Sequence, residues 1–172
     1  MLIKGTPDGL LLTGFILEIY SSRCVIRPFR ADEVQPFMAY RNDAEWMKYQ
    51  GFKGLTKEVY EKALLGTPSL FEGIQLAVVS KATNTLIGDI YLKQENEIFW
   101  LGYTVSPQHA GQGYAFEAAA AMICWIKMQG CSAIKAGVEV NNIPSKNLLN
   151  KLGFSYAGLE DGEQIFVLNN CP

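Results

Sequence analysis

The segment with the clearest chemical meaning is a glycine-rich loop, Pro107 to Gly113, which stands between an expected strand and an expected helix. Gly111 and Gly113 lack the Cβ atom that would keep an anion away from the main chain. The first N–H groups of a helix have no partner inside the helix, and that helix end carries a partial positive charge. Such a group of main-chain amides can bind a pyrophosphate without lysine or arginine. The loop therefore predicts a phosphorylated ligand.

The common nucleotide-binding motifs fit this loop poorly. A Walker loop needs Gly-Lys followed by Ser or Thr, but Gly113 is followed by Tyr114. A dinucleotide fingerprint needs a third glycine, and that position is Phe116. A nucleotide-binding α/β protein is therefore kept only as an alternative, which would predict that ATP or NAD stabilises the protein and coenzyme A does not.

The elements that would position this loop follow from hydrophobic periodicity and from turn-forming residues. Short turns at 82–84 and 94–96 predict three antiparallel strands in a row. The whole order predicts a mixed α/β (α+β) sheet with helices on both faces. The expected strands are 23–29, 74–80, 85–93, 97–105, 133–140, 154–159 and 164–169, and the expected helices are 32–41, 44–49, 56–65, 114–129 and 145–152.

Composition restricts the classes of function. The chain has 172 residues, of which 49% are hydrophobic, and this fits one globular domain. Its net charge is −2 and no basic stripe is visible, so a nucleic-acid partner is not expected. Residues 1–21 are predicted to form an extra strand or arm, and residues 22–172 the domain. The apolar run Leu10–Tyr20 is too short to span a bilayer and makes a poor signal peptide, so we expect a cytoplasmic protein without a membrane partner.

Cysteine and histidine usage argues against a metal site. The chain has four cysteines without a CxxC pair and a single histidine, His109. Two disulfides are one interpretation of the even count, but free thiols in a reducing compartment are favoured. Cys124 and Cys131 are expected to be buried.

The spacing Gln108-x-x-Gly111-x-Gly113 resembles the acyl-CoA loop of the GNAT N-acetyltransferases. The wider run LGYTVSPQHAGQGYAFEA at 101–118 is similar to the RimJ/RimL-like branch, the ribosomal-protein-alanine acetyltransferases. The segments RNDAEWMKY at 41–49, NIPS at 142–145 and LNKLGF at 149–154 resemble the same branch. The resemblance extends over about residues 22 to 168, in the order that the family has.

This resemblance implies the GNAT acyl-CoA N-acyltransferase fold, a mostly antiparallel central sheet with helices on both faces and one splayed pair of parallel strands. Here these strands are 97–105 and 133–140. The acetyl-pantetheine arm would lie between them like an added strand. A main-chain N–H near 103–105 would then face the thioester oxygen. The implied enzyme is an acyltransferase that moves an acetyl group from acetyl-CoA directly to a primary amine in a ternary complex, without a metal.

The acceptor amine is not specified by the sequence. It could belong to a protein N-terminus or to a small molecule, and a homodimer is possible by resemblance. A non-catalytic acyl-CoA-binding or regulatory module on the same fold is kept as the alternative function.

The residues expected to bind the cofactor lie at the end of strand 97–105, in the loop, at the start of the following helix, and on helix 145–152 or just before it. They are Tyr103, Thr104, Val105, Gln108, His109, Ala110, Gly111, Gln112, Gly113, Tyr114, Ala115, Asn142, Ser145 and Lys151. Asn142 and Ser145 also suit helix capping. The side chain of His109 is not expected to be catalytic. Glu117 is interpreted as a partner of the helix dipole.

Two positions depart from the family pattern. Many relatives carry a general-acid Tyr four residues before the Gly of the Gly-Phe pair, where this chain has Leu149. Many RimJ/RimL-like chains carry Glu where this chain has Trp100, which makes a strongly cationic acceptor less expected. Ser145 is then the candidate proton donor, and Trp46 and Trp100 are expected to line the acceptor pocket. Deprotonation of the amine is left to a water chain or to the carboxylates of Glu97 or Asp89.

Overall fold

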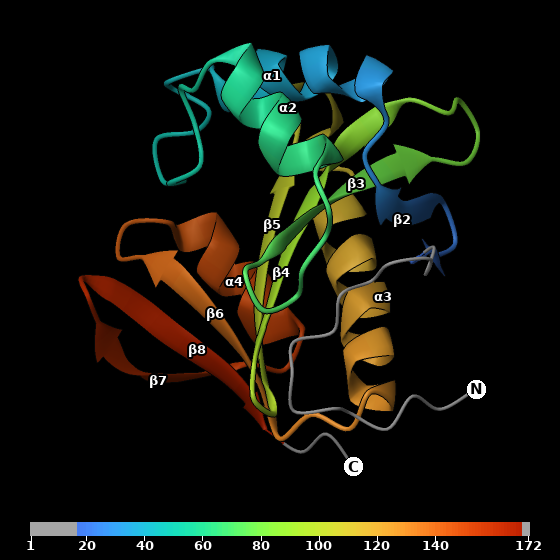
Figure 1. Cartoon of the computed structure of the whole chain (residues 1–172). Coiled ribbons are helices and arrows are strands. Elements are labelled where there is room, and N and C mark those ends of the chain that lie inside the picture. Colours follow the sequence, from blue (N-terminus) through green and yellow to red (C-terminus); the bar gives the residue numbers. More distant parts are fainter. Residues whose placement is uncertain (1–16, 170–172) are drawn as a thin grey trace.

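A computed structural model describes residues 17–169 and contains a mixed sheet with the strand order β1-β2-β3-β4-β5-β6-β8-β7 (Figure 1). The strands are β1 (Ile19–Tyr20), β2 (Cys24–Pro28), β3 (Ile74–Ser80), β4 (Leu86–Glu95), β5 (Ile98–Val105), β6 (Ala133–Glu139), β7 (Ser155–Glu160) and β8 (Glu163–Asn169). The helices are α1 (Val34–Arg41), α2 (Lys57–Leu65), α3 (Tyr114–Met128) and α4 (Ile143–Lys151), with 3-10 turns at Ala31–Glu33 and Pro107–His109.

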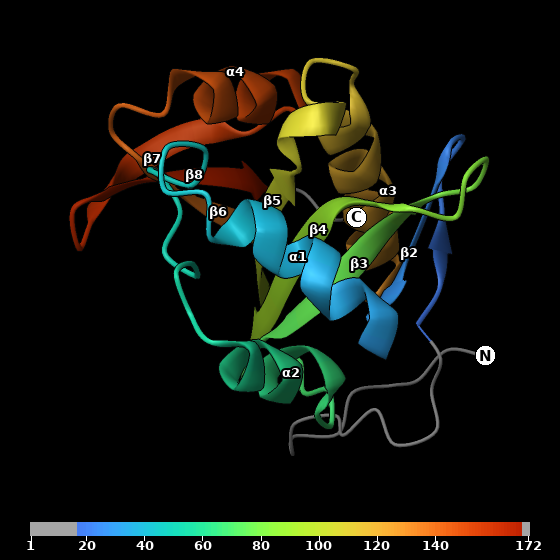
Figure 2. The ribbon, with the colours of Figure 1, turned by 90° about the horizontal axis from the view of Figure 1, so that it is seen from above.

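Helices cover both faces of the sheet, as the sequence predicts: α1 and α2 lie over one face, and α3 and α4 over the other (Figure 2). Strand β3 shows why, because its side chains alternate between the faces. Leu76 and Val78 pack in the large core with α3, and Ala77 and Val79 pack in a second core with α1 and α2. Both faces of β3 are therefore buried and mostly apolar.

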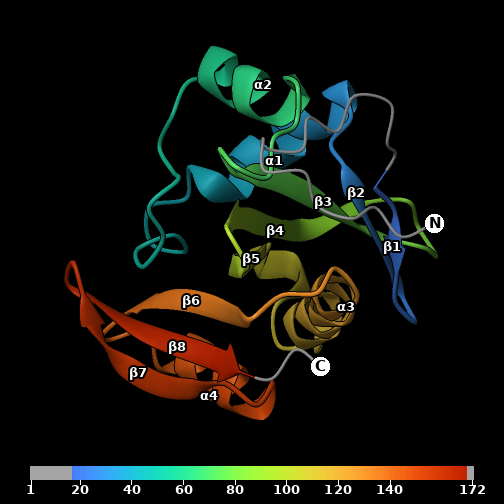
Figure 3. The ribbon, with the colours of Figure 1, turned by 60° about the horizontal axis from the view of Figure 1, so that its bottom comes forward.

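The parallel pair β5–β6 is joined only at one end. Pairing begins at Ile98 with Ala133 and ends at Trp100 with Lys135, although β5 continues to Val105. Strand β6 instead pairs along its whole length with β8. The sheet therefore parts beyond Trp100, and its two halves diverge from there (Figure 3). This confirms the splayed strand pair that the resemblance to the GNAT family implies.

The helix predicted over residues 44–49 is wrong: this segment is a succession of turns between α1 and α2. The Asp43 side chain stabilises the start of these turns, because its Oδ1 accepts from the N–H of Trp46 at 3.0 Å. The Trp46 indole is in turn hydrogen-bonded to β5. These tertiary contacts replace the regular hydrogen bonds that helix propensity alone would favour.

Two predictions about the cysteines also fail. Cys24 and Cys124 are free, but Cys131 is disulfide-bonded. Cys131 is buried as expected, whereas Cys124 is exposed. The residues of α3 that are buried are Ala118, Ala119, Met122, Ile123 and Ile126, and helical periodicity turns position 124 away from that stripe.

The expected N-terminal arm falls largely outside the described residues. Its last part forms the short strand β1, in which Ile19 pairs with Ile26 of β2. Among residues 17–169, no helix is long and apolar enough to cross a membrane. The division of the chain at residue 21 stays a prediction.

Candidate active site

A cavity of about 1250 Å³ lies where the sheet parts. Five segments line it: the end of β5, the loop after it, the first turn of α3, the α4 region, and the turns between α1 and α2. The lining residues are Asp43, Glu45, Trp46, Met47, Lys48, Tyr49, Gln50, Tyr103, Thr104, Val105, Pro107, His109, Ala110, Gly111, Gly113, Tyr114, Ala115, Phe116, Asn142, Pro144, Ser145, Asn147, Leu148 and Lys151. Sites for one small ligand measure roughly 300–1,000 Å³. This volume has room for a cofactor and an acceptor together.

The loop between β5 and α3 presents main-chain amides to the cavity. Gly111 has φ +71° and Gly113 has φ +82°, and these left-handed conformations strongly favour glycine. Within the described part of the chain, the N–H groups of residues 111–116 donate to no main-chain carbonyl. The regular helix ladder starts at Glu117, whose N–H donates to the Gly113 carbonyl at 3.1 Å. The loop thus offers a concave row of free donors that fits a diphosphate.

The end of β5 supplies further free main-chain groups. The Ser106 N–H donates to the carbonyl of Ile87 in β4 at 2.8 Å. Along β5, the main-chain groups of every second residue therefore point toward β4. The N–H groups of Tyr103 and Val105 then point to the other edge, where β6 has already diverged. The Val105 carbonyl faces the same way, because it accepts from the Trp46 indole and not from β4. A ligand that lies in the split can therefore hydrogen-bond to β5.

Tyr103 and Ser145 meet across the opening between β5 and α4. The Tyr103 hydroxyl lies 2.9 Å from Ser145 Oγ and donates to the Ser145 carbonyl at 3.1 Å. Asn142 caps α4, and its Oδ1 accepts from the Ser145 N–H at 3.3 Å. Burial raises the pKa of Tyr103 to about 12, although the hydrogen bond to Ser145 acts in the opposite direction. The phenol is therefore a neutral donor at ordinary pH, and it leaves the serine hydroxyl hydrogen able to reach the cavity.

The other end of the cavity is built by the turns that follow α1. Trp46 anchors these turns to the sheet, since its Nε1 donates to the Val105 carbonyl at 2.9 Å. Lys48 pairs with Glu45 at 3.3 Å and lies 5.2 Å from the centre of the Tyr49 ring. Asp43 and Glu45 are the carboxylates that line the cavity among the described residues. This end is thus made of side chains, in contrast to the main-chain amides of the loop.

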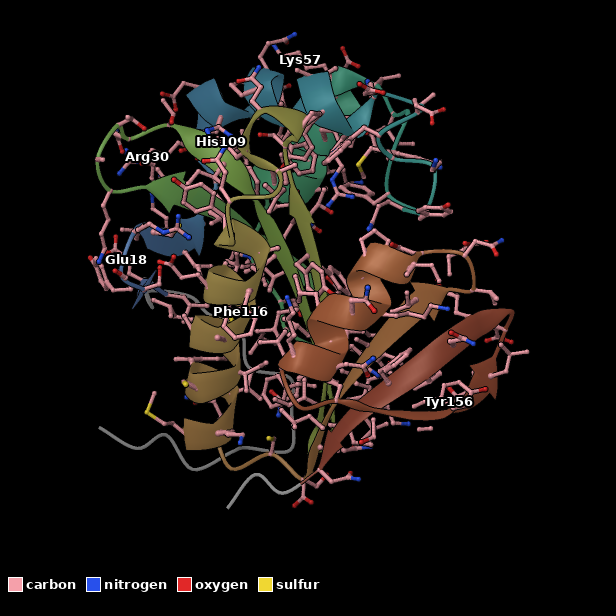
Figure 4. All side chains as sticks on the ribbon, turned by 180° about the vertical axis from the view of Figure 1, so that it is seen from behind. Glu18, Arg30, Lys57, His109, Phe116 and Tyr156 are labelled. Carbon is pink, nitrogen blue, oxygen red and sulfur yellow. The ribbon has the colours of Figure 1, made fainter. Side chains whose placement is uncertain are left out.

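Most of the residues predicted from the sequence as site residues lie together in the cavity. Gln108 and Gln112 belong to the loop but do not line the cavity; the Gln112 amide donates to the Gln108 carbonyl at 3.2 Å. His109 lines the cavity, with Nδ1 2.8 Å from Ser106 Oγ, and it stands above α3 (Figure 4). Lys151 lines it too, whereas Lys146 instead donates to the Val140 carbonyl at 2.7 Å.

Trp100 does not line the cavity, which corrects its predicted place in the acceptor pocket. It lies on the last residue pair before β5 and β6 part. Its Nε1 donates to Glu95 at 3.1 Å, and Lys135 lies 5.4 Å from the centre of its ring. The identity of residue 100 therefore gives no argument for or against a cationic acceptor.

The carboxylates considered as bases from the sequence do not reach the cavity either. Asp89 is buried against α1, where Tyr40, Arg41 and Gln75 donate to it. Glu97 is exposed at the start of β5, at the end away from the split. Leu149, at the position of the usual tyrosine, is fully buried in the core.

Eleven lining residues were not among the site residues predicted from the sequence. They are Asp43, Glu45, Met47, Lys48, Tyr49, Gln50, Pro107, Phe116, Pro144, Asn147 and Leu148. Phe116 lies on the side of α3 that faces α4 (Figure 4). Pro144, Leu148 and Lys151 follow each other at helical spacing, so the expected contact at Lys151 could have revealed the other two. Residues 17–169 contain no cluster of His, Cys, Asp and Glu that could hold a metal ion.

The fold and this cavity define an α/β protein in which an extended phosphorylated ligand can lie between two diverging strands. A family model, described as an acetyltransferase (GNAT) domain, matches residues 23–155. The uncharacterized N-acetyltransferase p20 of Bacillus licheniformis is 27% identical over 154 residues, which cover 82% of this chain and 84% of that protein.

Solved structures share the fold. A GNAT-family acetyltransferase from Bacillus anthracis has a TM-score of 0.76 at 23% identity and covers 89% of this chain and 98% of its own. RimL, the ribosomal L7/L12 alpha-N-protein acetyltransferase, in complex with coenzyme A, has a TM-score of 0.75 at 15% identity, with the same coverage of 89% and 98%. The chain belongs to the GNAT family of acetyltransferases and is an N-acetyltransferase.

Proposed function

We propose that this protein transfers an acetyl group from acetyl-CoA directly to a primary amine, in a ternary complex. The observation that carries the proposal is the row of free main-chain amides at residues 111–116, which is continuous with the split between β5 and β6. The RimL complex with coenzyme A, on the same fold, supports this choice of cofactor. The acceptor is a protein N-terminus or a small-molecule amine. The cytoplasmic location and a possible homodimer stay predictions from the sequence.

The chain would bind the cofactor at three places. The amides of the loop and the positive end of α3 would hold the diphosphate. The free edge of β5 would pair with the amides of the pantetheine arm, as an added strand pairs with a sheet. Lys151, on the lining face of α4, would meet the phosphate of the nucleotide end as a solvated cation. The thioester would then lie near Tyr103 and Ser145.

Acetyl transfer needs a donor for the carbonyl oxygen, which gains negative charge when the amine attacks. The N–H groups of Tyr103 and Val105 face the split and lack a ladder partner there, so they can donate to this oxygen. They belong to the rigid strand β5, and their direction is set before the substrate binds. Because the amine attacks the thioester directly, positioning within the ternary complex supplies much of the rate.

The departing thiolate also needs a proton. Ser145 is suited to donate it, because its hydroxyl lines the cavity and Tyr103 lies 2.9 Å behind it. The proton passes from Ser145 Oγ to the thiolate sulfur as the C–S bond breaks. The serine oxygen takes a proton back, through water, from the attacking nitrogen, which loses its second proton as the amide forms. The Tyr103 hydroxyl can turn its hydrogen from the Ser145 carbonyl to Ser145 Oγ, 2.9 Å away, and so stabilise the serine oxygen as its proton leaves. The nearby N-terminus of α4 stabilises negative charge at the same position.

The acceptor must lose a proton to become a nucleophile. Asp43 and Glu45 lie at the acceptor end of the cavity, and we propose that water passes the ammonium proton toward these carboxylates. Trp46 would form the wall between the acceptor and β5. In the net reaction the ammonium becomes a neutral amide, and the coenzyme leaves as a neutral thiol.

Two measurements test this function. Calorimetry should register binding of coenzyme A and acetyl-CoA, and thiol release should appear with some members of a panel of amines and N-terminal peptides. The absence of coenzyme A binding by well-folded protein would overturn the proposal. Binding without turnover on any acceptor would instead favour a non-catalytic acyl-CoA-binding module.

A further inference from the structure

Arg23 reaches the cofactor loop from a distant part of the sequence. It precedes β2, and its side chain crosses to the start of α3. Its Nη1 donates to the Gln112 carbonyl at 3.1 Å, and its guanidinium carbon lies 4.1 Å from the centre of the Tyr114 ring. Its Nη2 is 3.5 Å from the place where a Cβ on Gly113 would stand. The guanidinium therefore lies against the outer side of the loop that offers its amides to the cavity.

The same arginine is bound twice to Glu117 in the first turn of α3. The Arg23 Nε lies 2.6 Å from Glu117 Oε2, and its main-chain N–H donates to Oε1 at 2.6 Å. The Ser21 hydroxyl donates to Oε1 at 2.7 Å. Burial alone would raise the pKa of the Glu117 carboxyl, but these hydrogen bonds outweigh it and lower the pKa. Glu117 is thus ionised and satisfied.

An ionised carboxylate at this position has two opposite effects. It stabilises α3, because negative charge interacts favourably with the N-terminal end of a helix. It also repels any anion bound at the same helix end, and such repulsion is substantial at short distance in a partly buried site. A cation in contact with the carboxylate removes the second effect and leaves the first. Arg23 is in contact with Glu117 and with the loop at once.

We propose that Arg23 is a positioning residue for the cofactor: it neutralises Glu117 and holds the Gln112 carbonyl, so that the loop amides face a diphosphate without an uncompensated negative charge beside it. This inference rests on the proposed function. Arginine suits the task better than lysine, because one planar group donates to the carboxylate and to the carbonyl while it stacks on Tyr114.

The test compares Arg23→Ala, Glu117→Gln and the double variant in the full chain, with coenzyme A as the probe in calorimetry. We expect Arg23→Ala to weaken coenzyme A binding about tenfold, the size of effect that one uncompensated neighbouring charge can have. Glu117→Gln should bind about twofold more tightly. The double variant should recover most of the lost affinity, because the repelling charge is gone.

If the Arg23–Glu117 pair has only a structural role, each single variant should weaken coenzyme A binding, and the double variant should bind no more tightly than Arg23→Ala. Kinetics give a second readout: the KM for acetyl-CoA should rise in Arg23→Ala while kcat changes less than about twofold. Raising the salt concentration should reduce the difference between Arg23→Ala and the unmodified protein, because salt screens the repulsion. If Arg23→Ala does not fold, Arg23→Lys replaces it in the test, because lysine keeps the charge but loses the planar fork. Its coenzyme A affinity should lie between that of the unmodified protein and the roughly tenfold weaker value expected for Arg23→Ala.

Lys93→Ala is the matched control. Lys93 forms an ion pair of the same length, 2.6 Å, with Glu95, outside the residues that line the cavity, and its removal changes the net charge equally. Its coenzyme A affinity should not change. If the unmodified protein fails to bind coenzyme A, the proposed function is wrong. If it binds and Arg23→Ala binds equally well, or the double variant stays as weak as Arg23→Ala, only the role of Arg23 is wrong.

Discussion

The two ends of the cavity are built in different ways. At the cofactor end, a strand, a loop with positive φ angles and two helix N-termini present main-chain amides and one serine. At the acceptor end, a run of turns after α1 presents Asp43, Glu45, Trp46 and Tyr49, and one indole hydrogen bond joins these turns to the sheet.

The difference fits what we propose that each end recognises. A diphosphate and an extended amide chain can be bound by main-chain groups, whose positions depend on secondary structure and on a few glycines. An acceptor is distinguished by its own chemical groups, so the site must use side chains. Changes to the main-chain groups at the cofactor end should therefore alter coenzyme A affinity, and changes at the acceptor end should alter only the KM for the acceptor.

The largest effect is expected at Gly113. Gly113→Val places a branched side chain at φ +82°, where L-residues are strained, and displaces the amides that follow. We expect coenzyme A affinity to fall at least about a hundredfold, or about 2.7 kcal/mol by calorimetry. Gly130→Val is the matched control, because Gly130 also has φ +82° but ends α3 far from the lining residues. Both variants should lose similar thermal stability, and only the first should lose coenzyme A. Equal coenzyme A affinities of the two variants would refute the proposed diphosphate site at residues 111–116.

A smaller effect is expected at Ser145. Ser145→Ala removes the proposed proton donor, and kcat should fall about tenfold or more while the KM for acetyl-CoA changes little. Tyr103→Phe keeps the serine hydroxyl and should lower kcat less. Steady-state kinetics with one amine decide between the two. A kcat that stays unchanged in Ser145→Ala would assign proton donation to water.

The two tryptophans give the sharpest contrast at the acceptor end. Trp46→Phe loses the hydrogen bond to Val105 that holds the turns on β5, which is worth about 1 kcal/mol. The KM for the acceptor should rise about threefold to fivefold, and coenzyme A affinity should stay the same. Trp100→Phe is the control, since Trp100 contacts Glu95 and Lys135 outside the cavity and should change neither constant. An effect of Trp100→Phe on the acceptor KM would restore its predicted place in the pocket.

The smallest effect concerns pH. Hydrogen bonds hold the pKa of Glu117 below its ordinary value in the folded protein, so this carboxylate stabilises the fold above the ordinary carboxyl pKa of about 4.3. The contribution is lost as the pH falls through the lowered pKa. The unfolding free energy of the unmodified protein should exceed that of Glu117→Gln by about 1 kcal/mol or less at pH 6, and the difference should shrink toward pH 3. Denaturant unfolding at both pH values measures it, and a difference that grows on acidification would contradict it.

The local structure at the proposed cofactor end could be predicted from the sequence, because its signals are local. Glycines two residues apart, the cap at Asn142 and alternation along β5 all act through the nearest main-chain groups. The hairpin turn between β7 and β8 is equally local in origin, since Asp161 and Gly162 both have positive φ there. The split between β5 and β6 rested on the resemblance, because nothing in either strand marks where pairing ends.

The turn structure of residues 44–49 and the contacts of Arg23 could not be predicted in this way. Residues 44–49 have the composition of a helix, but the contact between Trp46 and β5 joins positions 59 residues apart and changes the local structure. The bond between Arg23 and Glu117 spans 94 residues. Trp100 was placed wrongly for the opposite reason. The resemblance put this position at the acceptor pocket, but the pairing of β5 with β6 still includes Trp100, and its side chain does not line the cavity.

Amide chemical shifts of the labelled protein, recorded during a titration with acetyl-CoA, would test the central claim most directly. The amide protons of residues 111–116 have no main-chain acceptor in the described structure, so phosphate binding should move them strongly downfield, together with those of Tyr103 and Val105. The amides of residues 43–50 should respond only when an acceptor is added. Saturating acetyl-CoA that leaves residues 111–116 unmoved, or that shifts other amides instead, would contradict the account.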